Sequence, residues 1–163
     1  MIKLAVLGAT GSIGMNTLDL AGKFPDKIKI VSLSCGRNVE RLAYQIRKFQ
    51  PKIAAVADAE AAGRLRTILA DMGLSPRPQI QWGPDGLSAA AAEAGADTVL
   101  SAIVGEAGLV PTMAAVQAGL KVALANKESL VLGGELLMPL AKKSGPEIVP
   151  VDSEHSAIFQ VLE

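Results

Sequence analysis

The stretch that decides the fold is Val6-Leu7-Gly8-Ala9-Thr10-Gly11-Ser12-Ile13-Gly14, close to the start of the chain. An apolar, β-prone run, residues 2–7, leads into it, and an amphipathic run with helical spacing follows it. A strand, a glycine-rich turn and a helix form the context in which spaced glycines bind a phosphate, because the backbone can approach the anion and the helix N-terminus favours it. Five residues are predicted to share one face of that helix: Ile13, Thr17, Leu20, Ala21 and Phe24.

The spacing of these glycines is G-x-x-G-x-x-G, because Ala9 stands where the usual dinucleotide fingerprint has its first glycine. The turn is therefore predicted to bind a phosphate group. A tight strand-to-helix turn without any ligand is the alternative.

Composition narrows the possible functions. The chain has 163 residues, half of them hydrophobic, which suffices for one domain, or for one domain with the beginning of another. Lys plus Arg and Asp plus Glu both number 16, so no net charge attracts nucleic acid or an acidic membrane. One cysteine, Cys35, and one histidine exclude an internal disulfide and a Cys/His zinc site. Without a membrane-spanning run or a signal peptide, we expect a cytoplasmic protein with no nucleic-acid or membrane partner.

The rest of the chain alternates predicted strands with predicted helices. Further strands are predicted at 28–34, 53–57, 79–82, 98–104, 121–125 and 147–151. Further helices are predicted at 39–49, 59–72, 86–94, 109–118 and 130–143. Short apolar strands in this alternation predict an α/β fold, a doubly wound, mostly parallel, Rossmann-like sheet with helices on both faces. Residues 1–150 are predicted to form this domain, and 151–163 to begin a second one.

The second strand ends in Gly36-Arg37-Asn38, with no acid before Glu40. In dinucleotide-binding sheets an acid at this point binds the ribose 2′-hydroxyl of NAD, whereas an Arg accommodates the 2′-phosphate of NADP. Arg37 can form bidentate bonds to a phosphate, and Asn38 can donate beside it. The pattern favours NADPH over NADH; a solvated Arg in an ordinary loop is the alternative.

A second polar stretch, Ala125-Asn126-Lys127-Glu128-Ser129, directly follows an apolar strand. Ligands of open α/β sheets bind outside the carboxyl ends of the strands, so this stretch is well placed to meet a cofactor and a substrate. The alternative is a helix start, with Asn126 as the cap and Glu128 near the helix dipole. Since that alternative leaves Lys127 without a role, we favour the functional interpretation.

The third polar stretch is Val151-Asp152-Ser153-Glu154-His155. In an extended segment Asp152 and Glu154 point the same way, and carboxylates suit Mg²⁺ or Mn²⁺, although two acids are too few for a strong site. Spacing alone favours the alternative, in which Asp152 or Ser153 caps a last helix and Glu154 lies in its first turn. The helical pattern of residues 156–163 stops without a cap, which suggests a fragment of a longer protein.

Together these motifs resemble a known family. Four stretches, in this order, closely resemble 1-deoxy-D-xylulose 5-phosphate reductoisomerase, and the similarity covers the whole chain: residues 7–14, 36–39, 125–129 and 151–160. The resemblance implies an enzyme of the non-mevalonate route to isoprenoids. It would rearrange 1-deoxy-D-xylulose 5-phosphate and reduce the resulting aldehyde with NADPH, giving 2-C-methyl-D-erythritol 4-phosphate.

The resemblance also implies roles for individual residues. Those that would hold the cofactor pyrophosphate are Thr10, Gly11, Ser12 and Ile13. The adenosine 2′-phosphate would be bound by Gly36, Arg37 and Asn38. The nicotinamide side would be lined by Ala102 and Ile103, and Asn126 and Glu128 would be further cofactor contacts. The substrate and catalytic positions would be Lys127, Ser153 and Glu154, and the metal ligands Asp152 and Glu154, which replaces the capping interpretation of these two acids.

The chain also departs from the family pattern. The third acidic metal ligand, the mobile lid, most of the substrate-phosphate pocket and the C-terminal helical domain have no counterpart in it. We therefore expect this chain to bind NADPH weakly without turning over substrate, and the full-length enzyme to be a homodimer whose contacts lie largely elsewhere. The alternatives are another NADPH-dependent enzyme, such as an aspartate-semialdehyde dehydrogenase or a dihydrodipicolinate reductase, or a non-catalytic nucleotide-binding module. Neither enzyme carries the Asn-Lys-Glu-Ser and Asp-Ser-Glu-His pair.

Overall fold

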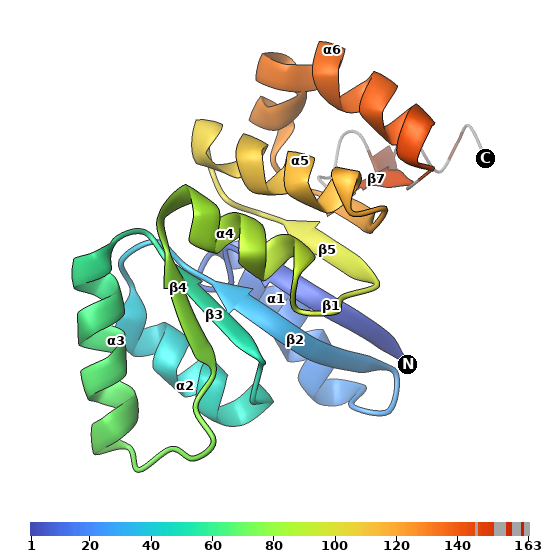
Figure 1. Ribbon diagram of the computed structural model, residues 1–163. Helices are drawn as coiled ribbons and strands as arrows, with labels where there is room; N and C mark the ends of the chain where they lie inside the picture. Colours follow the sequence, from blue (N-terminus) through green and yellow to red (C-terminus); the bar gives the residue numbers. More distant parts are fainter. Residues whose placement is uncertain (146, 152–155, 158–160, 162–163) are drawn as a thin grey trace.

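The computed structural model describes residues 1–145, 147–151, 156–157 and 161, and within them strands alternate with helices (Figure 1). The strands are β1 (Ile2–Leu7), β2 (Ile28–Ser34), β3 (Ile53–Val56), β4 (Gln79–Trp82), β5 (Thr98–Ser101), β6 (Lys121–Leu124) and β7 (Ile148–Pro150). The helices are α1 (Ser12–Lys23), α2 (Val39–Phe49), α3 (Ala59–Asp71), α4 (Gly83–Ala92), α5 (Leu109–Gln117) and α6 (Lys127–Ser144), with a 3₁₀ turn, η1 (Glu106–Gly108). None of the helices in these residues has the length and hydropathy that a membrane span requires.

The strands form one sheet in the order β4-β3-β2-β1-β5-β6-β7, and every pair of neighbours is parallel. The predicted doubly wound α/β fold is thus confirmed. The chain winds outward from β1 to one edge through β4, and then returns to the other side of β1 with β5. Because the winding reverses between β1 and β5, a crevice opens there at the carboxyl ends of the strands, where such sheets bind their ligands.

Helices cover both faces of the sheet (Figure 1). Consecutive residues of β1 point to opposite faces, because side chains alternate along a strand. Leu4 and Val6 pack against α1, α2 and α3, whereas Ala5 and Leu7 pack in the core that α4, α5 and α6 complete. All four are buried, so β1 lies in the middle of the molecule and fixes the position of the turn that follows it.

The buried face of α1 differs from the predicted one. Gly14, Leu18 and Ala21 are buried, whereas Ile13, Leu20 and Phe24 are exposed. The reason is Gly14, where α1 packs directly on the backbone of the preceding turn: a Cβ at this position would overlap the Gly8 carbonyl oxygen. This contact sets the inward direction, and Leu18 and Ala21 follow at helical spacing.

Several boundaries also differ, and three of these differences bear on function. The strand predicted at 98–104 ends at Ser101, so residues 102–105 form a loop at the edge of the sheet. The last long helix begins at Lys127 rather than 130, so Lys127 and Glu128 belong to its first turn. Helix α4 begins at Gly83 rather than 86, because Pro84 is tolerated in a first helical turn.

Candidate functional site

The glycine-rich turn between β1 and α1 is built by close backbone contacts. Gly8 adopts φ +86°, a conformation that favours glycine, and a Cβ there would overlap the Ala102 carbonyl at the end of β5. The N–H groups of Gly8 and Ala9 donate to the Oγ and carbonyl oxygens of Ser34, at 3.1 and 2.7 Å. Strands β2 and β5 therefore hold the turn from its two sides.

The N-terminus of α1 is open to an anion. Gly11 occupies the cap position and has no side chain to accept the first N–H groups of the helix. Those groups have no acceptor within the helix, and the helix dipole adds a partial positive charge at the same point. The predicted phosphate-binding residues of this turn, Thr10 and Gly11, line the adjoining cleft. The turn thus offers both the space and the donors that a pyrophosphate requires.

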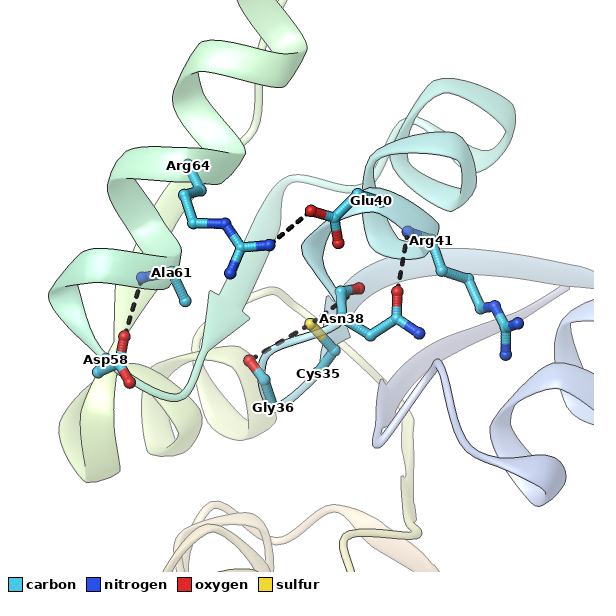
Figure 2. Close-up of polar contacts among 8 residues, drawn as sticks. All are labelled: Cys35, Gly36, Asn38, Glu40, Arg41, Asp58, Ala61 and Arg64. Atoms are coloured by element: carbon cyan, nitrogen blue, oxygen red, sulfur yellow. Dashed lines mark hydrogen bonds and ion pairs between the residues drawn. The ribbon is translucent and has the colours of Figure 1, made fainter.

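The end of β2 brings Arg37 and Asn38 to the same edge of the sheet. The Arg37 side chain is 81% exposed, and its Nε and Nη2 both lie 3.3 Å from Oδ2 of Asp58. Asn38 caps α2, since its Oδ1 accepts a hydrogen bond from the Arg41 N–H at 3.2 Å (Figure 2). Arg41 in turn donates from Nη1 to the Thr10 carbonyl at 3.4 Å, which links α2 to the glycine-rich turn.

Two acids at this edge of the sheet, Asp58 and Glu40, each pair with an arginine; Figure 2 shows the pair of Glu40 with Arg64. Asp58 caps α3 by accepting from the Ala61 N–H at 2.8 Å, and this hydrogen bond, together with Arg37, holds the pKa of Asp58 below its usual range. Glu40 pairs with Arg64 at 2.5 Å; a hydrogen bond from its own N–H and this pairing lower its pKa too. Both carboxylates are therefore charged at neutral pH.

A cleft of about 480 Å³ opens between the carboxyl ends of β1, β2 and β5. The predicted site residues that line it are Thr10, Gly11, Gly36, Ala102 and Ile103. Gly8, from the glycine-rich turn predicted to bind a phosphate, lines it too. The other lining residues were not predicted as site residues: Cys35, Ala57, Gly83, Pro84, Leu87, Val104, Ala107 and Val110. Most of these are apolar, and several directly follow a strand, which is the one signal that could have indicated them.

Cys35 forms part of this lining without being a nucleophile. Burial raises the pKa of its thiol to about 12, and the Sγ donates weakly to the carbonyl oxygens of Gly36 and Asn38 at 3.6 Å. Since the thiolate is the reactive form, Cys35 is inert at neutral pH.

Asn126 connects the start of α6 to the loop after β5. Its side chain is buried, at 2% exposure, and Nδ2 donates to the carbonyl oxygens of Ile103 and of Gly105, the latter at 2.9 Å. Its Oδ1 accepts from the Ser129 N–H at 3.0 Å, which confirms the capping role that was the alternative at this position. All three hydrogen bonds of the Asn126 side chain are with backbone atoms of the protein. A contact of Asn126 with a cofactor therefore stays a prediction.

A second cavity, of about 150 Å³, adjoins the cleft and shares Ala102, Ile103 and Val104 with it. Six predicted site residues line it, from three separate parts of the chain: Ile13, Ala102, Ile103, Asn126, Lys127 and Glu128. The structure thus brings the start of α1, the end of β5 and the start of α6 together. Arg37 and Asn38 do not line either cavity; they lie beside Gly36 at the rim of the larger one.

The predicted metal and substrate residues Asp152, Ser153 and Glu154 lie outside the described residues. Within the described part of the chain, no three His, Cys, Asp or Glu side chains gather closely enough to hold a metal ion. The metal site therefore stays a prediction.

A family model and known proteins match this chain in sequence over most of its length. The family model of 1-deoxy-D-xylulose 5-phosphate reductoisomerase matches residues 4–134. The enzyme of that name from Thermosynechococcus vestitus is 51% identical over 160 residues, which are 98% of this chain and 38% of that protein.

Solved structures give the same result. A DOX-P reductoisomerase in complex with NADPH, fosmidomycin and magnesium has a TM-score of 0.92 and 41% identity, over 98% of this chain and 38% of that one. The Zymomonas mobilis reductoisomerase in complex with NADPH has a TM-score of 0.90 and 44% identity, over 98% and 41%. The chain thus spans about two fifths of the length of the proteins it matches. With the family model covering most of its length, this chain belongs to the 1-deoxy-D-xylulose 5-phosphate reductoisomerase family.

Proposed function

We propose that this chain is the NADPH-binding part of an enzyme that converts 1-deoxy-D-xylulose 5-phosphate into 2-C-methyl-D-erythritol 4-phosphate. The observation that carries the proposal is the turn at Gly8–Gly14. It opens an uncapped helix N-terminus onto a cleft of about 480 Å³ at the reversal point of a parallel sheet. A cleft at this position in a parallel sheet, beside a helix N-terminus, is where such folds bind dinucleotides.

The pyrophosphate is bound at the start of α1 by Thr10, Gly11, Ser12 and Ile13. The support is local: Gly11 leaves the first N–H groups of the helix free, and Thr10 and Gly11 line the cleft. No side chain in this turn carries a negative charge that would oppose the phosphates.

The adenosine 2′-phosphate is bound at the end of β2 by Gly36, Arg37 and Asn38. Arg37 is exposed and can swing toward a ligand in the cleft beside Gly36. A guanidinium offers two parallel donors to a phosphate, so it recognises the group that distinguishes NADPH from NADH.

The nicotinamide lies at the opposite end, against Ala102 and Ile103. Asn126 holds the Ile103 and Gly105 carbonyls in place, so it positions this wall of the site. Glu128, half-buried in the first turn of α6, faces the small cavity as a cofactor contact, and the exposed Lys127 beside it contacts the substrate.

Bound NADPH supplies the hydride, and a bound divalent ion, Mg²⁺ or Mn²⁺, supplies Lewis-acid polarisation of the substrate oxygens. We propose Asp152 and Glu154 as two ligands of this ion, with Ser153 and Glu154 contacting substrate. The support is the carboxylate chemistry and the family membership. The described residues align the cofactor with the substrate. The two cavities share one wall, so the cofactor and the substrate meet beside Ile103 and Lys127.

We further propose that the complete enzyme is a cytoplasmic homodimer. The basis of both assignments is the resemblance of the chain to this enzyme family. Size-exclusion chromatography with light scattering on the complete polypeptide tests the homodimer. A monomer would contradict it.

A turnover assay on the complete polypeptide tests the activity. NADPH oxidation should require both 1-deoxy-D-xylulose 5-phosphate and a divalent ion, and Asp152→Asn should abolish it while leaving NADPH binding unchanged. NADPH oxidation that persists after chelation of divalent ions, or full activity in Asp152→Asn, would contradict the proposal.

A further inference from the structure

The arginine proposed for the 2′-phosphate already has a partner. Nε and Nη2 of Arg37 both approach the same oxygen of Asp58, Oδ2, at 3.3 Å. The long distances and the 81% exposure of the Arg37 side chain make this a loose surface ion pair, of the kind that contributes little to stability. The pair instead controls how much positive charge Arg37 offers to a ligand.

Asp58 is fixed, whereas Arg37 can move. The other carboxylate oxygen, Oδ1, accepts the Ala61 N–H at 2.8 Å and thereby caps α3 (Figure 2). When Arg37 swings toward a ligand, this hydrogen bond keeps the carboxylate where it is. The same hydrogen bond and the charge of Arg37 lower the pKa of Asp58, so the carboxylate stays negative at neutral pH.

Arg64, a second arginine at this edge of the sheet, does not neutralise the negative charge of Asp58. Arg64, on α3, is held by Glu40 of α2 at 2.5 Å, and the two side chains form their own pair (Figure 2). Asp58 therefore keeps its negative charge beside the place where the 2′-phosphate arrives.

We infer that Asp58 is a specificity-determining residue that weakens the binding of NADPH relative to NADH. It competes with the 2′-phosphate for Arg37, and its fixed charge repels that phosphate. This inference rests on the proposed NADPH binding. NADH has no 2′-phosphate, so Asp58 leaves its affinity almost unchanged.

The test compares the affinities of both cofactors for wild type and Asp58→Asn. Asparagine is as good a helix cap as aspartate, so this variant removes the charge and keeps the hydrogen bond to Ala61. NADPH should bind about three- to tenfold more tightly to Asp58→Asn, and NADH within about twofold of wild type. This gain in NADPH affinity should be smaller in roughly 0.5 M salt, because the salt screens the repulsion between Asp58 and the 2′-phosphate.

Glu60→Gln is the matched control. Glu60 lies in the first turn of α3, and no contact of its carboxylate with Arg37 occurs in the described part of the chain. Glu60→Gln removes one negative charge from the start of α3, as Asp58→Asn does, so a general electrostatic effect would appear equally in these two variants. Its NADPH affinity should stay within about twofold of wild type.

The outcomes separate the inference from the proposed function. Wild type that binds NADPH, together with an Asp58→Asn variant that binds it equally or more weakly, would overturn the inference alone. A folded wild-type chain that binds no NADPH would overturn both. If Asp58→Asn does not fold by circular dichroism, Asp58→Ser, another neutral cap, takes its place with the same expectations.

Discussion

The side-chain amide of Asn126 donates to the carbonyl oxygen of Ile103, 23 residues earlier in the sequence. This hydrogen bond joins the loop after β5 to the start of α6, and these two segments form the walls of the small cavity. Asn126 is thus the residue that holds the proposed nicotinamide wall together.

Replacing Asn126 by Ala should destabilise the protein by about 2–4 kcal/mol. The change leaves the carbonyls of Ile103 and Gly105 and the N–H of Ser129 without their partner at a buried position. Chemical denaturation measures this effect.

Ser129→Ala is the control from the same turn. The Ser129 Oγ is buried and has no hydrogen-bond partner among the described residues, so its removal should change stability by less than about 1 kcal/mol. Equal losses in Asn126→Ala and Ser129→Ala would contradict the role given to Asn126.

Gly14→Ala should disrupt the glycine-rich turn. The new Cβ would overlap the Gly8 carbonyl oxygen and approach the Ala9 Cα to 2.7 Å, so the backbone must shift. We expect a loss of about 1–3 kcal/mol in unfolding free energy and at least roughly tenfold weaker NADPH binding.

Gly63→Ala on α3 provides the comparison, because a Cβ there meets nothing within 4 Å. That variant should be more stable than wild type by about 0.5–1 kcal/mol, as expected for an exposed helical glycine. A Gly14→Ala variant that is as stable as Gly63→Ala would contradict the close packing of α1 on the glycine-rich turn.

Cys35 should make stability fall with pH in the alkaline range. Its pKa is raised from 9.0 to about 12 in the folded protein, so this contribution to stability is complete below pH 9 and is lost as pH rises toward 12. Between pH 8 and 10 the loss of unfolding free energy due to Cys35 should be on the order of 1 kcal/mol.

Urea denaturation of wild type and Cys35→Ala at both pH values measures this difference. The variant lacks the thiol, so its stability should fall less than that of wild type, by on the order of 1 kcal/mol. Identical pH dependence in the two proteins would show that the thiol titrates normally in the fold.

This chain alone should not consume NADPH when 1-deoxy-D-xylulose 5-phosphate and Mg²⁺ are added. The expectation rests on its length, since it spans about two fifths of the length of the relatives it matches. Absorbance of the reduced nicotinamide at a fixed wavelength follows the reaction. Substrate-dependent oxidation by the chain alone would contradict this expectation.

Much of the fold could be predicted from the sequence because local signals agree with tertiary structure. Strand β2 and helix α2 have the predicted bounds, residues 28–34 and 39–49. In β2 the apolar, β-prone residues Ile28, Ile30, Val31 and Leu33 indicate the strand, and residues 30–34 are buried. In α2 the cap Asn38 precedes a strong apolar face, so the start and the orientation of the helix are both marked.

Orientation could not be predicted where apolar residues occur on more than one side of a helix. In α1, Ile13 and Leu20 are apolar but exposed, and the inward face follows from the contact of Gly14 with Gly8. That contact involves backbone atoms, for which hydrophobic periodicity gives no signal.

The candidate site likewise contains residues that the sequence indicates and residues that it does not. Residues with distinctive chemistry, such as Arg37 and Lys127, could be proposed from position and type, and their roles stay predictions. The apolar lining at Ala57, Gly83 and Leu87 could not, since it depends on which strands are neighbours. The pairing of Arg37 with Asp58 likewise requires that β3 lie beside β2.

The most direct test of the account is a calorimetric titration of this chain with NADPH and with NADH, for wild type and Arg37→Met. We expect saturable binding of NADPH at one site, about tenfold or more weakened by Arg37→Met, with NADH affinity little changed. A folded wild-type chain that binds no NADPH would contradict the central claim, and equal losses for both cofactors in Arg37→Met would contradict the assignment of Arg37 to the 2′-phosphate.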